Sequence, residues 1–448
     1  MPRPFGTNSD YKQNNNIPTI MVKQCRILLA LALMTAVIVS IIKHQPDAVC
    51  KTEAAPVTEE LDNVVFDEWF CDSTLRLDYI FAGNSKVQNI YLDKMSRYPR
   101  WAGRKQRLNE LPLTGNGQII VRDASTNATL YMTSFSSLFQ EWIVTEEAQQ
   151  QDRSFENCFQ IPMPVKPVIA EVRLLNNRHE VTAMMQHRID PADILISRIG
   201  EKDLTPHHYV IDNGDPAANI DIAFLAEGYT SEEMKEFNEY VSIAVDAMFE
   251  HEPFRTFRNK FNIVAVESAS AESGVSVPKD GLWKNTAFSS HFSTFYSDRY
   301  LTTLHLKDVH NALAGIPYEH IIILANSDEY GGGGIYNSYN MTSTKHKWYR
   351  PVVVHEFGHS FAGLGDEYEY GDENHETYPL DIEPWEKNIT TKVDPEKAAR
   401  VGKVEGGGYS TTGVFRAYED CRMRTNQNPE FCPICCEAIT DIIKFYTE

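Results

Sequence analysis

The pattern of apolar and polar positions divides the chain into two parts. Between Val64 and about Glu201, short segments rich in β-branched and aromatic residues are separated by turn signals such as Thr-Gly-Asn-Gly at 114–117. The clearest of these segments are residues 74–81, 118–122 and 168–174. Short alternating strands with frequent turns are typical of an antiparallel β-sandwich, which is the fold expected for this part.

From about Thr205 the pattern changes, because apolar runs suited to interior strands now alternate with helical periodicity. Residues 220–226 form such a run. Thr230 and Glu233 then have the spacing of a capping box, so we expect a helix to begin there and to end before Pro253. Its apolar face comprises Met234, Phe237, Val241, Val245 and Met248. Alternating strands and helices predict an α/β arrangement.

Two further apolar runs, residues 261–266 and 320–325, are expected to add strands to the same sheet. Four glycines at 331–334 follow the second run and predict a mobile turn. An ordinary sheet edge and an edge that binds an extended substrate are both compatible with this stretch.

The length of the chain indicates how many domains to expect, and its net charge excludes some classes of binding partner. The 448 residues exceed what one hydrophobic core usually organises. We therefore expect an N-terminal segment over residues 1–50, a β-sandwich domain over 51–204 and an α/β domain over 205–448. The net charge of −20 at pH 7 repels phosphate groups and anionic lipid headgroups, which argues against nucleic-acid binding and polybasic membrane attachment. No pattern indicates an oligomeric state.

The N-terminal segment has the character of an export signal. Residues 27–42 are apolar and follow Lys23 and Arg26. This run of 16 residues is marginal for spanning a bilayer, so it is expected to act either as a cleaved signal peptide or as a retained membrane anchor. In both cases the rest of the chain is exported and is secreted, periplasmic or attached to the cell surface.

Four cysteines lie close together near the C-terminus, at Cys421, Cys432, Cys435 and Cys436. Disulfides persist outside the cytoplasm, so we expect at least one disulfide between Cys421 and the cluster at 432–436. The alternative is that these cysteines bind a zinc ion, in addition to the zinc site described next, although their spacing resembles no common zinc knuckle.

The segment at residues 351–368 carries the candidate chemistry. His355 and His359 are four residues apart, so on a helix they project from one face and their imidazole nitrogens can bind one Zn²⁺. Glu356 completes a His-Glu-x-x-His motif and is placed to accept a proton from water at the metal. The motif therefore predicts zinc-dependent hydrolysis of peptide bonds, with Glu356 as the general base.

A third ligand is expected from the residues that follow this helix. Gly363 supplies a turn that reverses the chain, and Asp366 follows with a hard carboxylate, which leaves a fourth position open for water. Glu367 competes with Asp366 for this role. A later glutamate, Glu396 or Glu405, would instead indicate a gluzincin-type peptidase that catalyses the same reaction.

The stretch from His355 to Tyr368 resembles the signature of the immunoglobulin A peptidase family of metallopeptidases, which are metzincin-like zinc enzymes. The resemblance continues at residues 421–424 and 431–435, and the β-rich part is similar to the N-terminal domain of that family. It implies a metzincin-like α/β (α+β) catalytic domain in which Met423 is the Met-turn residue, an apolar floor beneath the metal ligands. Members are secreted or surface-attached bacterial proteins.

These features together predict an exported zinc-dependent metalloendopeptidase, a hydrolase that acts on a protein or peptide substrate. The alternative is a surface adhesin or glycan-binding protein that retains a structural zinc site. Glu356 argues against this alternative, because a purely structural metal site needs no general base.

Overall fold

The computed structural model describes residues 61–371 and 376–448. The predicted export signal or anchor, with the whole of residues 1–50, lies outside these residues. Among the helices of the described residues, none is long and apolar enough to cross a membrane.

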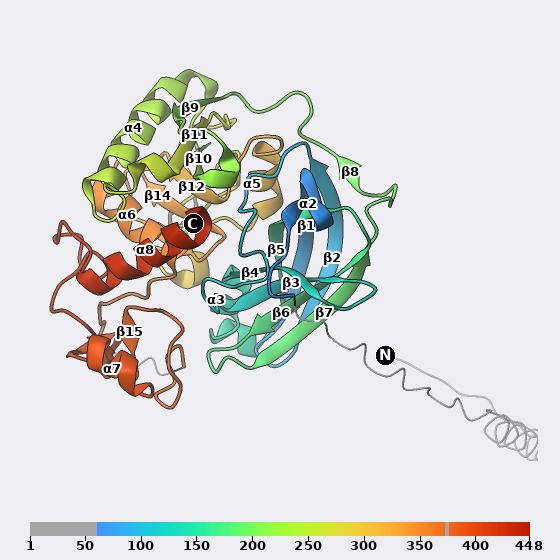
Figure 1. The fold of residues 1–448 in the computed structure, drawn as a ribbon. Coiled ribbons are helices and arrows are strands. Elements are labelled where there is room, and N and C mark those ends of the chain that lie inside the picture. The colour runs from blue at the N-terminus through green and yellow to red at the C-terminus, as the bar shows by residue number, and fades with distance from the viewer. Residues whose placement is uncertain (1–60, 372–375) are drawn as a thin grey trace, which may run out of the picture. The chain divides into compact units, whose positions relative to one another are not determined.

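The N-terminal part consists of two four-stranded sheets (Figure 1), which confirms the prediction of a β-rich region. Neighbouring strands are antiparallel, except that the short strand β8 runs parallel to β2. In sheet order, the first sheet is β5 (Arg153–Pro164), β1 (Phe70–Gly83), β2 (Gln88–Tyr98) and β8 (Ser197–Arg198), and the second is β4 (Thr129–Phe135), β3 (Gly117–Asp123), β6 (Val168–Leu175) and β7 (Val181–Ile189). Aromatic side chains from both sheets, including Phe81 and Phe135, share one buried core.

The C-terminal part is built on a six-stranded sheet in which β10, β11, β12 and β14 are parallel and the two outer strands are antiparallel to their neighbours. Its order is β13 (Gly332–Ile335), β14 (Tyr339–Ser343), β12 (His320–Ala325), β10 (Ile220–Glu227), β11 (Phe261–Val266) and β9 (His207–Ile211). The three strands predicted at 220–226, 261–266 and 320–325 are confirmed. The last strand of the N-terminal sheets ends at Arg198, and the first strand of the six-stranded sheet begins at His207. The division into two domains stays a prediction.

Alternate residues of β10 point into two different cores, because successive side chains of a strand point to opposite faces. Ile222 and Phe224 pack with helices on one face, while Ala223 and Leu225 join the core of the N-terminal sheets on the other. The covering helices are α4 (Met234–Glu250), α6 (Tyr349–Ala362) and α8 (Pro433–Thr447), which Figure 1 shows on the opposite side from strands β1 to β7. The sheet is therefore buried on both faces, as its apolar strands require.

The predicted helix after residue 230 is confirmed, with the capping box formed by Thr230 and Glu233. A short 3₁₀ turn, η3 (Ser231–Glu233), precedes α4. The other helical elements are α2 (Phe66–Trp69), α3 (Leu138–Trp142), α5 (Leu306–Ala312), α7 (Pro395–Val401), η1 (Glu147–Gln149), η2 (Pro216–Ala218), η4 (Arg258–Lys260), η5 (Pro278–Asp280) and η6 (Thr294–Tyr296). A small sheet of β15 (Ile389–Thr390), β17 (Ser410–Arg416) and β16 (Val404–Gly407) lies between α6 and α8 in the sequence.

The prediction of a mobile turn at residues 331–334 is wrong, because Gly332–Ile335 form the edge strand β13. Gly332 and Gly334 pack closely against α6. A Cβ atom on Gly332 would lie 2.7 Å from Oε1 of Glu356, and one on Gly334 would lie 2.3 Å from the backbone oxygen of Glu356. These two glycines thus allow close contact with the helix that carries the candidate site.

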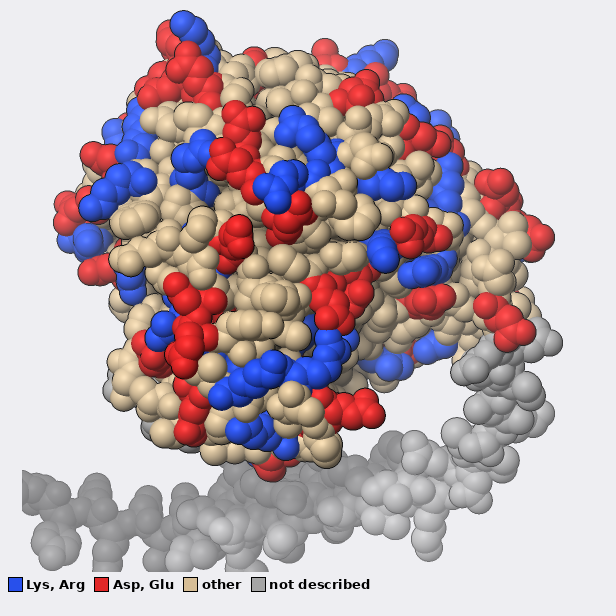
Figure 2. All heavy atoms as spheres, turned by 60° about the vertical axis from the view of Figure 1, so that its left-hand side comes forward, with Lys and Arg blue, Asp and Glu red and all other residues tan. Residues whose placement is uncertain are grey.

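Acidic and basic side chains are interspersed over the face of the protein shown in Figure 2, where no single basic area dominates. The net charge of the chain is −20. The distribution on this face agrees with the charge argument against nucleic-acid binding, which stays a prediction.

Candidate metal centre

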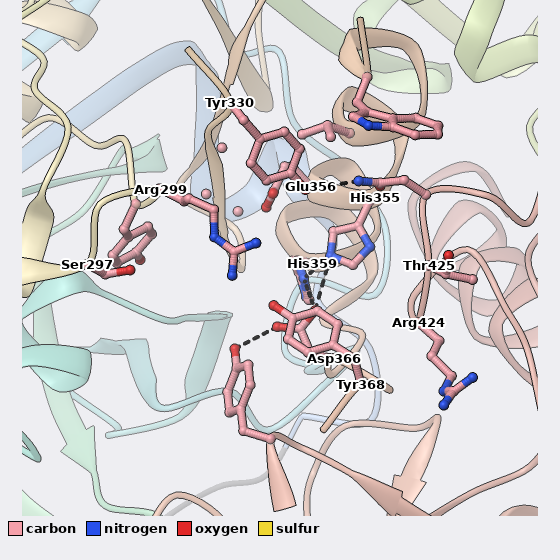
Figure 3. A pocket seen from close by; sticks show the side chains of 18 of the residues that line it. Ser297, Arg299, Tyr330, His355, Glu356, His359, Asp366, Tyr368, Arg424 and Thr425 are labelled. Carbon is pink, nitrogen blue, oxygen red and sulfur yellow. Dashed lines mark hydrogen bonds and ion pairs between the residues drawn. The ribbon is translucent and has the colours of Figure 1, made fainter. Parts of the chain in front are cut away.

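Helix α6 and the loop after it bring three polar side chains to one point (Figure 3). His355 and His359 lie one turn apart on α6, and their Nε2 atoms are 3.1 Å from each other. Gly363 ends the helix in the left-handed conformation, with a φ of 56°, as predicted for the turn. The reversal carries Asp366 back, so that its Oδ1 lies 3.0 Å from Nε2 of His355 and 3.1 Å from Nε2 of His359.

Hydrogen bonds to the backbone orient both imidazole rings. Nδ1 of His355 lies 3.0 Å from the carbonyl oxygen of Arg422, and Nδ1 of His359 lies 2.5 Å from that of Leu364. A carbonyl oxygen only accepts, so each Nδ1 carries a proton. In the neutral ring, each Nε2 then directs its lone pair toward the shared point.

The three atoms at this point fit a metal ion. Oδ1 of Asp366 is buried and accepts no well-aligned hydrogen bond from the described residues, while its Oδ2 accepts one from the hydroxyl of Tyr409 at 2.6 Å. In a tetrahedral site with bonds of about 2.0–2.1 Å, neighbouring ligand atoms are about 3.3 Å apart. The observed separations of 3.0 and 3.1 Å are close to this value. Two imidazole nitrogens and one carboxylate oxygen therefore form a suitable donor set for a divalent cation.

The charges of the site depend on whether a cation is bound. Without one, burial lowers the pKa of His359, but the carboxylate of Asp366 more than offsets this effect and raises that pKa to about 9. A proton then occupies the position that a metal ion would take. Burial raises the pKa of Glu356, and Asp366 adds to this rise, whereas His355 and His359 oppose it.

Glu356 stands beside the three converging groups without joining them. Its side chain lies along β13, where Gly332 leaves room for the carboxylate. It also lines the same cleft as His355, His359 and Asp366. This position leaves the Glu356 carboxylate free to act on a molecule that enters the cleft.

The cleft has a volume of about 1250 Å³ and draws its walls from distant segments of the chain. Three glycines of β13 form one wall and the segment from Arg424 to Gln427 forms another. Figure 3 shows Arg299, Tyr330 and Arg424 around the opening that leads to His355 and His359. A space of this size accommodates several residues of an extended chain.

Sequence reasoning missed Glu141, which comes from α3 in the N-terminal part and lines the cleft. Its Oε2 accepts a hydrogen bond from the hydroxyl of Tyr300, and burial is the main cause that raises its pKa to about 7. No motif surrounds Glu141 in the sequence. Only the shared core of the two parts brings this residue to the site.

Met423 lies against α6, as the Met-turn interpretation requires of an apolar floor. Its side chain is fully buried, and a Cβ atom on Gly358 would lie 2.7 Å from the Met423 sulfur. Gly358 lies between His355 and His359 on the helix. The methionine thus packs against the turn of helix that presents both histidines.

The other candidates for the third ligand lie elsewhere. Glu367 is fully buried and accepts a hydrogen bond from the amide of Asn388, outside the cleft lining. Glu405 accepts a hydrogen bond from the backbone of Gly413, and Glu396 lies in the exposed first turn of α7. Among these carboxylates, the structure brings only Asp366 to the two histidines.

The predicted disulfide is wrong for this structure, because Cys421, Cys432, Cys435 and Cys436 are all free thiols. The sulfur atoms of Cys421 and Cys435 are 3.7 Å apart, too far for a covalent bond of about 2.05 Å. The thiol of Cys436 points away from this pair and donates to the backbone oxygen of Glu252. Cys421, Cys432 and Cys435 instead surround the carboxylate of Glu367.

Comparison with known families agrees with this architecture. The family model described as IgA Peptidase M64 matches residues 209–400 and 394–443, which include His355, Glu356, His359 and Asp366. The model described as Peptidase M64 N-terminus matches residues 65–186, within the two N-terminal sheets. No curated protein matches the chain. Since the first model alone matches more than half of the chain, the protein belongs to the IgA peptidase M64 family of metallopeptidases.

Proposed function

We propose that this protein is an exported zinc endopeptidase, in which His355, His359 and Asp366 hold the zinc ion and Glu356 is the general base. The observation that carries the proposal is the convergence of two Nε2 atoms and one carboxylate oxygen, 3.0–3.1 Å apart, beside a partly buried glutamate in a large cleft. Zinc suits this donor set and leaves a fourth position free.

A bound zinc ion supplies Lewis acidity, which polarises a carbonyl group and lowers the pKa of water. Glu356 transfers the protons, and Tyr409 orients a metal ligand. Glu356 accepts a proton from the attacking water, and burial makes its carboxylate a better acceptor by raising its pKa. The same carboxyl group then donates the proton to the amine of the departing product. Tyr409 holds Asp366 in place through the hydrogen bond to Oδ2.

The cleft supports binding of an extended polypeptide. The backbone of β13 lies at the edge of the six-stranded sheet, and Gly332, Gly333 and Gly334 line the cleft without side chains that would block it. An extended substrate can therefore approach this backbone closely, as in recognition by addition of a strand. The opening of the cleft along a strand favours cleavage within a chain.

Export is part of the proposal, and it rests on residues 27–42 of the sequence. A binding protein with a structural metal site is less well supported. Glu356 lines the cleft next to the candidate ligands, where a purely structural site would have no use for a free carboxylate.

Hydrolysis of casein and of a quenched peptide library tests this function. Purified full-length protein should cleave both, lose activity with a chelator and regain it with added zinc. The matched control is the double variant His355→Ala, His359→Ala, which should be inactive under all conditions. Activity that survives complete removal of metal would contradict the proposal. Mass spectrometry of the cleaved library would then identify the substrate preference.

A further inference from the structure

A second convergence of metal-binding groups lies where the loop after α6 meets the start of α8. Cys421, Cys432, Cys435 and Glu367 each offer one ligand atom, and these four atoms lie within 4.8 Å of one another. All four residues are buried, and Glu367, Cys421 and Cys435 are fully inaccessible. We propose that this Cys₃Glu cluster is a structural zinc site, separate from the site at His355.

The distances agree with tetrahedral coordination. Zinc–sulfur bonds of about 2.3 Å place two sulfur ligands about 3.8 Å apart, and a sulfur and a carboxylate oxygen about 3.6 Å apart. The sulfur atoms of Cys421 and Cys435 are 3.7 Å apart, and the sulfur of Cys435 lies 3.3 Å from Oε1 of Glu367. The side chains are therefore arranged around a point that an ion of this size would fill.

A disulfide explains the cluster less well than a metal ion. A bond between two of the three cysteines would leave the third thiol and the carboxylate of Glu367 packed against it. Oε2 of Glu367 has no hydrogen-bond partner among the described residues, and the side chain is fully buried. Burying a carboxylate oxygen without a partner is costly, so four converging donors indicate a positive ion at their centre.

Hydrogen-bond donors and a helix N-terminus surround the cluster and favour negatively charged ligands. The backbone amide of Cys432 donates to the sulfur of Cys421 at 3.2 Å, and Nδ2 of Asn388 donates to Oε1 of Glu367 at 2.9 Å. Cys432 is the N-cap of α8 and Cys435 lies in its first turn. The positive end of this helix dipole favours negatively charged sulfur. Such outer contacts orient ligands and reduce repulsion between them.

A zinc ion here would stabilise the geometry of the catalytic site. Glu367 directly follows Asp366, and Cys421 lies two residues before Met423. The backbone amide of Glu367 also donates to the carbonyl oxygen of Met423 at 2.9 Å. A metal ion bound by both Glu367 and Cys421 would thus hold Asp366 in place, and with it Met423, which packs against Gly358.

Metal analysis of the full-length protein purified with zinc tests the proposal. Wild-type protein should contain about two zinc ions per chain. The double variant His355→Ala, His359→Ala leaves the cysteine cluster intact and should retain about one. After replacement of zinc by Co²⁺, this variant should show thiolate-to-cobalt charge-transfer absorption in the near ultraviolet, which histidine and carboxylate ligands cannot produce. Neither readout depends on peptidase activity.

Two cysteine variants complete the test. Cys421→Ser combined with Cys435→Ser should abolish the charge-transfer band, whereas Cys436→Ser should retain it, because the Cys436 thiol points to the backbone of Glu252. The proposal would be overturned if the double variant His355→Ala, His359→Ala folds but binds no zinc and shows no charge-transfer band with Co²⁺. Thiol counting on denatured wild-type protein that finds Cys421, Cys432 or Cys435 in a disulfide would also overturn it.

Discussion

The hydroxyl of Tyr409 donates a hydrogen bond of 2.6 Å to Oδ2 of Asp366, whose other oxygen faces His355 and His359. The tyrosine comes from the turn before β17, far from α6 in the sequence. Its hydrogen bond holds the carboxylate in the one orientation that presents Oδ1 to both Nε2 atoms.

Removal of this hydroxyl should weaken metal binding. We expect Tyr409→Phe to lower the zinc affinity of the His355 site by about 10–100-fold, because Asp366 then loses the contact that orients it. Tyr370→Phe is the matched control, since the Tyr370 ring stacks on Tyr409 in the same cleft but its hydroxyl accepts a hydrogen bond from Arg299. Affinity is measured by recovery of activity in zinc buffers after chelation. Equal affinities of the two variants would contradict the role of Tyr409.

The proposed proton acceptor, Glu356, can be replaced without changing the proposed metal ligands. We expect Glu356→Gln to lower kcat by about 10²–10⁴-fold, because the amide keeps the shape of the side chain but cannot accept the proton from water. Metal content should equal that of wild type, since His355, His359 and Asp366 are unchanged. A variant with near wild-type kcat would show that another group is the general base.

The contact between Gly358 and Met423 predicts that a larger residue in the helix is destabilising. Alanine normally favours a helix over glycine by up to about 1 kcal/mol. At Gly358, however, the added Cβ would lie 2.7 Å from the Met423 sulfur, and overpacking of this kind costs about 1–3 kcal/mol. We therefore expect Gly358→Ala to lower the free energy of unfolding, measured by urea denaturation.

A double-mutant cycle is the control for this contact. Met423→Ala removes the clashing sulfur, so Gly358→Ala should be less harmful in the Met423→Ala background than in wild type. Additive effects of the two substitutions would mean that the contact does not cause the destabilisation.

The zinc affinity of the proposed catalytic site at His355, His359 and Asp366 should rise with pH. In the metal-free protein the pKa of His359 is about 9, above the usual value near 6.5, so the ring is protonated at pH 7 and the metal must displace this proton. Between pH 7 and 8, we expect the affinity to increase about tenfold, with the rise ending near pH 9. The measurement is zinc-dependent recovery of activity at each pH, expressed relative to the activity at saturating zinc at the same pH. An affinity independent of pH would contradict a protonated His359.

Much of the fold can be read from the order of residues. Apolar runs at 220–226, 261–266 and 320–325 form interior strands because they lie in a sheet buried on both faces. The capping box at Thr230 and the turn at Gly363 also behave as predicted, since both depend on local geometry. The glycines at 331–334 were misleading, because three of them belong to the edge strand β13 and two of these, Gly332 and Gly334, pack against α6.

The site shows the same division between local and distant information. Spacing alone places His355, Glu356 and His359, because one turn of helix determines which way they point, and the glycine turn brings Asp366 within reach. Glu141, Tyr409 and the partners of the C-terminal cysteines carry no local signal. Glu141 reaches the cleft only because the N-terminal sheets share a core with the six-stranded sheet, and Glu367 meets the cysteines only because α8 packs on α6. Side chains far apart in sequence are brought together by burial of apolar surface, which depends on the whole chain and not on any one segment.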